Sequence, residues 1–188
     1  MTIETEELLL RRPARADARR NYDALIAAAR AGFAELGTAA PLEEIARRAG
    51  VGIATLYRNF PTREALIESV YLEEVDAVCK AADAVADLEP WPAMLTWIDR
   101  LVEYVGTKRV LVDAMNRNSS TLKACREQLY TAGAPLLRRA QDAGVVRKDI
   151  GIDDLLRLVT GVTGASFPTT EQRDRVLAIA LDGLRVVI

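Results

Sequence analysis

The sequence contains no histidine and only two cysteines among its 188 residues. Cys79 and Cys125 lie far apart and lack the CxxC spacing of a zinc site, and no histidine is present to complete a metal site or act as a base. The glycines form no phosphate-binding loop pattern. We therefore expect two reduced cysteines, no metal, no cofactor and no enzymatic activity.

Aromatic residues are also scarce, at 5% of the chain, although hydrophobic residues make up 50%. Alanine, leucine, arginine and glutamate dominate, and these residues favour helices, whereas strands are enriched in β-branched and aromatic residues. We therefore predict an all-α fold. The length fits one large domain or a small domain joined to a larger one.

Long apolar runs are missing as well. The N-terminal run Leu8–Leu10 is too short for a signal sequence or a membrane span, and acidic residues precede it. From this we expect a cytoplasmic protein without a membrane partner.

The charge is small overall but unevenly placed. The net charge is −2, yet residues 8–63 hold ten Arg and Lys against five Asp and Glu, and residues 64–188 hold fifteen against nineteen. A basic N-terminal part joined to a mildly acidic remainder suits a DNA-binding module on a larger domain. Ordinary solvated helix faces would give the same imbalance.

Apolar spacing predicts a series of helices in the N-terminal part. Asp17 is placed to cap a helix that ends at Gly37, and Thr62 is placed to cap one that runs to about Ala86. Two short helices lie between them, at 42–49 and 53–59, with Gly50 after the first. We predict a flexible arm at 1–16, a DNA-binding domain at 17–71 and a second domain at 72–188.

The second domain is predicted to be helical throughout. A helix begins at Pro90 and Pro92, a shorter one covers 110–116, and one at 122–143 contains Pro135, which should kink or split it. The last two helices are expected at 153–165 and 170–187, and both carry more apolar residues than one buried face needs.

Residues 42–61 have the layout of a helix-turn-helix, whose second helix lies in the major groove of DNA. Leu56 and Phe60 lie four residues apart and should anchor that helix in the core. The residues then left on or near the exposed side are Thr55, Tyr57, Arg58 and Asn59. The planar fork of Arg58 can read a guanine edge or bind a phosphate.

Three segments resemble the TetR family of transcriptional regulators: Phe33–Gly37, Glu44–Val51 and Ala54–Leu66. Residues 136–149 and 181–185 are similar to an actinobacterial-type C-terminal subclass. The resemblance implies a homodimer that binds double-stranded, palindromic operator DNA and is released by a small ligand. Two alternatives stay open, namely an activator of the same fold and a helical protein-interaction module that does not bind DNA.

The resemblance also implies roles for single residues. Thr55 and Tyr57 would contact phosphates, and Ile53 and Ala54 would face base edges, although Ile53 could instead belong to the core. Asn59 stands where the family more often has His, Arg63 replaces the usual Lys as a phosphate ligand, and Pro41 replaces a Thr or Ser. An arm with Arg11, Arg12 and Arg15 could enter the minor groove or remain a solvated tail.

In the second domain the resemblance implies a ligand pocket and a two-fold interface. The large side chains that could line a pocket for a mainly apolar ligand, or simply form the core, are Met94, Trp97, Leu101, Tyr104, Met115, Tyr130 and Phe167. The apolar residues expected at the dimer interface, or buried within one chain, are Leu155, Leu158, Val162, Leu177, Leu181 and Leu184.

Overall fold

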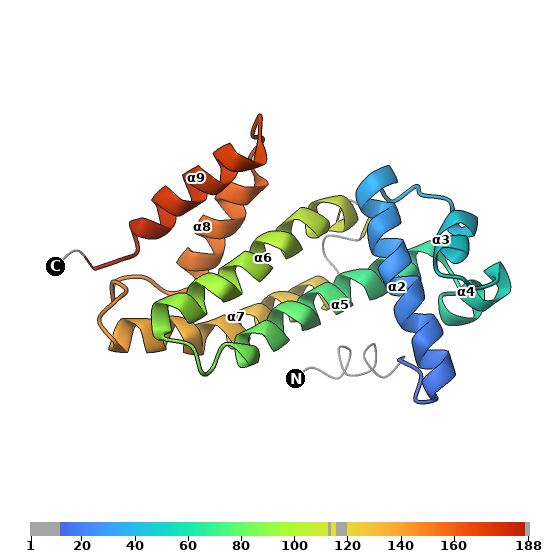
Figure 1. Ribbon diagram of the computed structural model, residues 1–188, viewed down its shortest axis with the longest axis horizontal. Helices are drawn as coiled ribbons and strands as arrows, with labels where there is room; N and C mark the ends of the chain where they lie inside the picture. Colours follow the sequence, from blue (N-terminus) through green and yellow to red (C-terminus); the bar gives the residue numbers. More distant parts are fainter. Residues whose placement is uncertain (1–11, 113, 116–119, 187–188) are drawn as a thin grey trace. The chain divides into compact units, whose positions relative to one another are not determined.

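The computed structural model describes residues 12–112, 114–115 and 120–186 (Figure 1). Helices form most of this part of the chain, and the part described contains no β-strand, so the predicted all-α fold is confirmed. With the numbering of Figure 1, the helices are α2 (Ala16–Leu36), α3 (Leu42–Arg48), α4 (Ile53–Asn59), α5 (Arg63–Ala84), α6 (Pro90–Val112), α7 (Ser120–Asp142), α8 (Ile152–Gly164) and α9 (Thr170–Asp182).

The chain forms two compact units that do not follow its linear order. The first contains the residues up to 74 together with 107–125, and the second contains 75–106 and the residues from 126 onward. Each change from one unit to the other therefore falls inside a helix, in α5, α6 and α7. The predicted boundary between residues 71 and 72 stays a prediction.

In the first unit, α2 packs against α3 and α3 against α4. Apolar side chains with at most 2% of their surface exposed form its core: Leu25, Phe33, Ile45, Leu56, Phe60, Leu66, Ile67 and Val70. The unit also contains an ion pair between Arg30 of α2 and Glu74 of α5, whose carboxylate is almost fully buried. Burial of that carboxylate makes its partner essential, because an unpaired buried charge is strongly destabilising.

Trp97 lies in the core of the second unit. Its side chain is fully buried, and its Nε1 donates a hydrogen bond of 3.1 Å to the carbonyl oxygen of Val78. Helix α7 approaches it at Gly133, where an added Cβ would lie 2.4 Å from Trp97 Cη2 and 2.8 Å from Ile152 Cδ1. Only glycine fits at this approach without displacing its neighbours.

Two of the predicted helix limits, those of α2 and α6, are wrong. Helix α2 begins at Ala16, so Asp17 lies in its first turn instead of capping it. Helix α6 continues to Val112, so the separate helix expected at 110–116 does not begin at residue 110, and residues 113 and 116 of that range lie outside the described residues. Gly106 does not end it, because a glycine costs a helix only about 1 kcal/mol and the residues on both sides, Val105 and Leu111, are buried.

Helix α7 runs through Pro135 as one helix. Of the two expected effects of Pro135, a split is therefore wrong, and a kink stays a prediction. Pro135 is exposed, as is Thr131 one turn earlier, so water can reach the carbonyl that the proline leaves without an N–H partner. Helix α9 ends at Asp182 instead of near 187, because the chain then pairs with the segment after α7. The N–H of Arg147 donates to the Leu184 carbonyl over 2.9 Å.

No helix in the described ranges is both long and apolar enough to cross a membrane.

Candidate nucleic-acid interface

The turn between α3 and α4 is built around Gly50. Its φ is +69°, a left-handed conformation that favours glycine. The N–H of Gly50 donates to the Arg47 carbonyl over 3.1 Å, and that of Val51 donates to the Ala46 carbonyl over 3.0 Å. These two bonds make a Schellman motif, which ends α3 and sets where α4 begins. The predicted role of Gly50 is confirmed.

Helix α4 is fixed by one apolar face, as predicted. Leu56 and Phe60 are 0% and 1% exposed, and the Phe60 ring lies 5.2 Å from that of Tyr22 on α2, measured between centroids. Tyr57 is 46% exposed, and Ala54 and Arg58 are exposed too. The opposite face of α4 therefore offers one small residue, one hydroxyl and one guanidinium to a partner.

The remaining candidates on α4 are half-buried: Ile53, Thr55 and Asn59. Arg58 Nη2 donates to the Thr55 hydroxyl over 2.9 Å, and Asn59 Nδ2 donates to the Thr55 carbonyl over 2.8 Å. The first bond holds the Arg58 guanidinium close to α4, and the second holds the Asn59 amide against the backbone of the same helix. The Thr55 hydroxyl accepts from Arg58 and keeps its own proton for donation.

Sequence reasoning missed a contribution from α2. A shallow hollow beside α4 is lined by Ala18, Asn21, Thr55, Arg58 and Asn59. Asn21 is exposed and adds an amide to the polar groups of α4. The spacing of Ala18 and Asn21 puts them on one helix face. An asparagine on that face, next to Arg19 and Arg20 in sequence, is the signal that could have indicated a contribution of α2 to the interface.

Arg63 has partners that the sequence does not suggest. Its Nη1 donates to the Thr38 carbonyl over 3.0 Å and also to the Ala40 carbonyl. It thus ties the start of α5 to the loop between α2 and α3, and a phosphate contact stays a prediction. The expected cap is confirmed, because the Thr62 hydroxyl accepts from the Ala65 N–H over 3.1 Å.

The outer surface of α3 is neutralised by its own ion pairs. Glu44 accepts from Arg47 over 2.7 Å and from Arg48 over 2.8 Å, and Arg48 also pairs with Glu35 of α2. These bonds, from Arg47 first and then Arg48, lower the pKa of Glu44 to about 2. Helix α3 therefore contributes less positive charge to a DNA partner than its two arginines suggest.

The arm residues have mixed positions. Arg12 pairs with Asp23 of α2 over 2.7 Å, Arg15 is exposed, and Arg11 lies outside the described residues. Insertion of Arg12 into a minor groove would require this ion pair to break.

The predicted ligand residues have different environments in the described part of the chain, and a shared pocket stays a prediction. Met94, Trp97, Leu101 and Tyr104 are at most 1% exposed and belong to the core, which was the alternative role. Met115 is half-buried in the first unit, whereas the other six belong to the second. Tyr130 and Phe167 are half-buried. None of the seven lines the open groove beside α6 and α9.

The candidate dimer residues are largely covered within one chain. Leu158 and Val162 are half-buried, while the other four are at most 7% exposed: Leu155, Leu177, Leu181 and Leu184. The large apolar side chains that α9 leaves exposed are Val176, at 36%, and Ile179, at 72%. The sequence did not distinguish these outer positions from the inner ones.

The comparisons with known proteins agree with this geometry. Residues 25–70 match the tetR family of bacterial regulatory proteins, and residues 89–186 match the C-terminal domain of SbtR-like transcriptional regulators. The chain belongs to the TetR family of transcriptional regulators. A search among curated proteins found no match.

Two solved structures of TetR regulators are similar over nearly their whole length. One, from Streptomyces coelicolor, shares 38% identity over 88% of this chain and 99% of its own, with a TM-score of 0.79. The other, from Mycobacterium vanbaalenii, shares 32% identity over 93% and 100%, with a TM-score of 0.75. The ketosteroid regulator KstR2 of Mycobacterium tuberculosis has the same fold, at 19% identity over 94% and 100% and a TM-score of 0.61.

Proposed function

We propose that this regulator is a ligand-released repressor that binds a palindromic operator as a homodimer. The observation that carries the proposal is the outer face of α4, where Tyr57 and Arg58 are exposed while Leu56 and Phe60 hold the helix in the core. A short helix presented in this way after a tight turn can enter a major groove. Thr55, Asn59 and Asn21 would donate to phosphates beside it.

Exposed apolar surface on α9 supports the homodimer. One face of α9 buries Leu177 and Leu181 within the chain, while Ile179, on the other side of the helix, is 72% exposed. On the adjacent helix α8, an added Cβ at Gly161 would touch nothing within 4 Å. A second copy could therefore approach α8 closely. Two reading helices about 34–36 Å apart would then match successive major grooves.

Selection of duplexes from a random pool, followed by binding titrations at increasing salt, tests the DNA-binding part. We expect palindromic sequences and an affinity that falls steeply with salt, because arginines and N–H groups displace counterions from phosphates. Equal and salt-independent binding to all duplexes would instead favour a protein-interaction module. A reporter gene under the selected operator distinguishes repression from activation.

Release by a ligand requires that ligand and operator weaken each other by the same factor, which for such couplings is about 5–150-fold. Retained operator affinity at saturating ligand would contradict release.

We also propose that the protein acts in the cytoplasm, because bacterial DNA lies there, and we expect no catalytic role.

A further inference from the structure

An open groove of about 470 Å³ lies in the second unit, between α6 and α9. Its two walls come from these helices alone, and none of the predicted pocket residues takes part. The residues that line it are Trp91, Leu95, Asp99, Val102 and Glu103 of α6, and Arg173, Asp174, Leu177, Ala178, Leu181 and Asp182 of α9.

Apolar side chains from both helices line part of the groove. Leu177 and Leu181 are 6% and 7% exposed, and Leu95 and Val102 on the facing helix are half-buried. These residues are packed on their inner sides and leave their outer atoms to the groove. A ligand with an apolar body would remove this surface from water, which is favourable by about 25 cal/mol per Å².

The polar lining has more acidic than basic side chains. Four carboxylates and the guanidinium of Arg173 line the groove. Two of these carboxylates have ion-pair partners, because Asp174 pairs with Arg173 over 2.7 Å and Glu103 pairs with Arg100 over 3.0 Å. Among the residues that the structure describes, the side chains of Asp99 and Asp182 form no ion pair. Partial burial, with Glu103 and Asp174 nearby, raises the pKa of Asp99. The carboxylate of Asp99 is thus left beside an apolar surface and near other negative charges, and a cation would be attracted to it.

Trp91, one of the lining residues, already has a cation near it. The guanidinium carbon of Arg185 lies 5.3 Å from the centroid of its ring. A tryptophan face attracts cations through its quadrupole, and arginine and organic ammonium groups share this mode of contact. One face of the Trp91 ring is therefore already occupied by a cation of the chain itself.

We propose that this groove binds an organic cation with an apolar body. The apolar part would lie on Leu95, Val102 and the outer atoms of α9, and the positive charge would lie beside Asp99. A neutral molecule of the same shape would leave Asp99 and Asp182 without a cationic partner, and an anionic one would be repelled by them. Binding of the cation in the groove does not depend on the proposed function. Only the further step, in which the bound cation releases the protein from DNA, rests on that proposed function.

Tetraphenylphosphonium and tetraphenylborate test the proposal directly, because they share a shape and differ in the sign of their charge. Calorimetric titration of the full-length protein, without DNA, should show binding of the phosphonium and none of the borate. Asp99→Asn should weaken phosphonium binding by about two- to fivefold, as expected for a carboxylate open to solvent. Asp142→Asn, the same change at an exposed site outside the lining, should leave binding unchanged.

Equal affinity for the two ions, or equal weakening by Asp99→Asn and Asp142→Asn, would overturn the proposal, as would an absence of heat at millimolar phosphonium. Circular dichroism of Asp99→Asn establishes that the variant is folded. A separate titration measures the affinity of the protein for selected DNA with phosphonium present. It distinguishes cation binding in the groove from release of DNA by that cation. If the cation binds in an Asp99-dependent way and DNA affinity stays unchanged, the groove proposal stands and ligand release by this site is contradicted.

Discussion

At the scale of single residues, Arg58 is the exposed cation on the outer face of α4, and its position leads to the first prediction. Arg58→Ala should cost about 1–3 kcal/mol of operator binding and relax specificity at one base pair if the guanidinium reads a guanine edge. Binding isotherms on a selected duplex and on its single-base variants measure both effects.

Arg138→Ala is a matched control, because Arg138 is an exposed arginine in α7 that belongs to the second unit. Its removal changes the net charge equally and should leave specificity intact. If Arg58→Ala lowers affinity for operator and random DNA by the same factor, the side chain binds a phosphate and does not read a base.

A second residue-scale prediction concerns Gly133, which allows α7 to approach Trp97. Gly133→Ala would place a methyl group 2.4 Å from Trp97 Cη2, and we expect such overpacking to lower the free energy of unfolding by about 1–3 kcal/mol. Gly106→Ala, in α6, meets nothing within 4 Å and should raise it by up to about 1 kcal/mol through helix propensity. Urea denaturation of both variants measures the contrast, and equal stability would contradict the close approach.

Sequence patterns predicted some contacts of the interface and missed others for a physical reason. Leu56 and Phe60 were predictable because apolar residues four apart share a helix face. The bonds of Arg63 were not, because the carbonyls of Thr38 and Ala40 lie 25 and 23 residues earlier in the chain. Backbone carbonyls are present at every residue, so no residue type marks them as partners.

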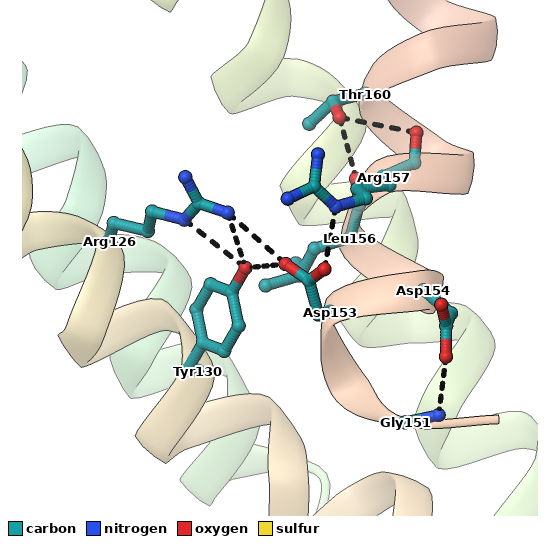
Figure 2. A network of polar contacts seen from close by, with 8 residues as sticks. All are labelled: Arg126, Tyr130, Gly151, Asp153, Asp154, Leu156, Arg157 and Thr160. Carbon is teal, nitrogen blue, oxygen red and sulfur yellow. Dashed lines mark hydrogen bonds and ion pairs between the residues drawn. The ribbon is translucent and has the colours of Figure 1, made fainter.

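At the scale of elements, a polar network joins α7 to α8 (Figure 2). Asp153 of α8 accepts a hydrogen bond from the Tyr130 hydroxyl of α7, one of 2.6 Å from Arg157, and one of 3.1 Å from Arg126. These bonds, that of Tyr130 first, lower the pKa of Asp153 to about 2. Tyr130, which we predicted to contact a ligand, donates its hydroxyl to Asp153 in this network, and a ligand contact stays a prediction.

The network predicts a pH dependence of stability. The folded-state pKa of Asp153 lies below the usual value of about 3.9, so its stabilisation is present above pH ~4 and is lost as the pH falls toward 2. Asp153→Asn should therefore be less stable than the wild type at pH 7, with a difference that shrinks below pH 4. Because these groups are exposed, we expect a small difference that salt reduces.

Denaturation curves at several pH values, with Asp142→Asn for comparison, measure this effect. A difference between Asp153→Asn and the wild type that stays constant from pH 7 to pH 3 would contradict the role of the ionised carboxylate.

The existence of the helices was predictable, whereas several of their ends were not. Gly50 ends α3 through a backbone hydrogen bond, and Thr62 caps α5 through its side chain. The local sequence is therefore sufficient to predict these two helix ends. The end of α9 depends on pairing of Leu184 with Arg147, residues 37 apart in sequence. Tertiary contacts of this kind override local propensity, and the excess apolar character of the last helix gave no sign of them.

At the scale of the whole molecule, the exposed side of α9 predicts the oligomeric state. Ile179→Glu should yield monomers with little operator affinity, because it places a charge on the outer face of α9, where Ile179 is 72% exposed. Multi-angle light scattering at micromolar concentration measures the mass. Leu36→Glu makes the same change at a residue of α2 that is 55% exposed, and this variant should remain dimeric. A dimeric Ile179→Glu protein would place the interface elsewhere.

The boundaries between the two units also bear on how separable the parts of this regulator are. All three lie within continuous helices, and the first unit includes residues 107–125. A protease that requires an extended linker finds none at these boundaries, so mild digestion should not release an intact DNA-binding fragment. A chimera that joins residues 1–71 to another sensor would lack 107–125 from its own unit. Such a transplant would need matching residues from the host for the DNA-binding part to keep its stability.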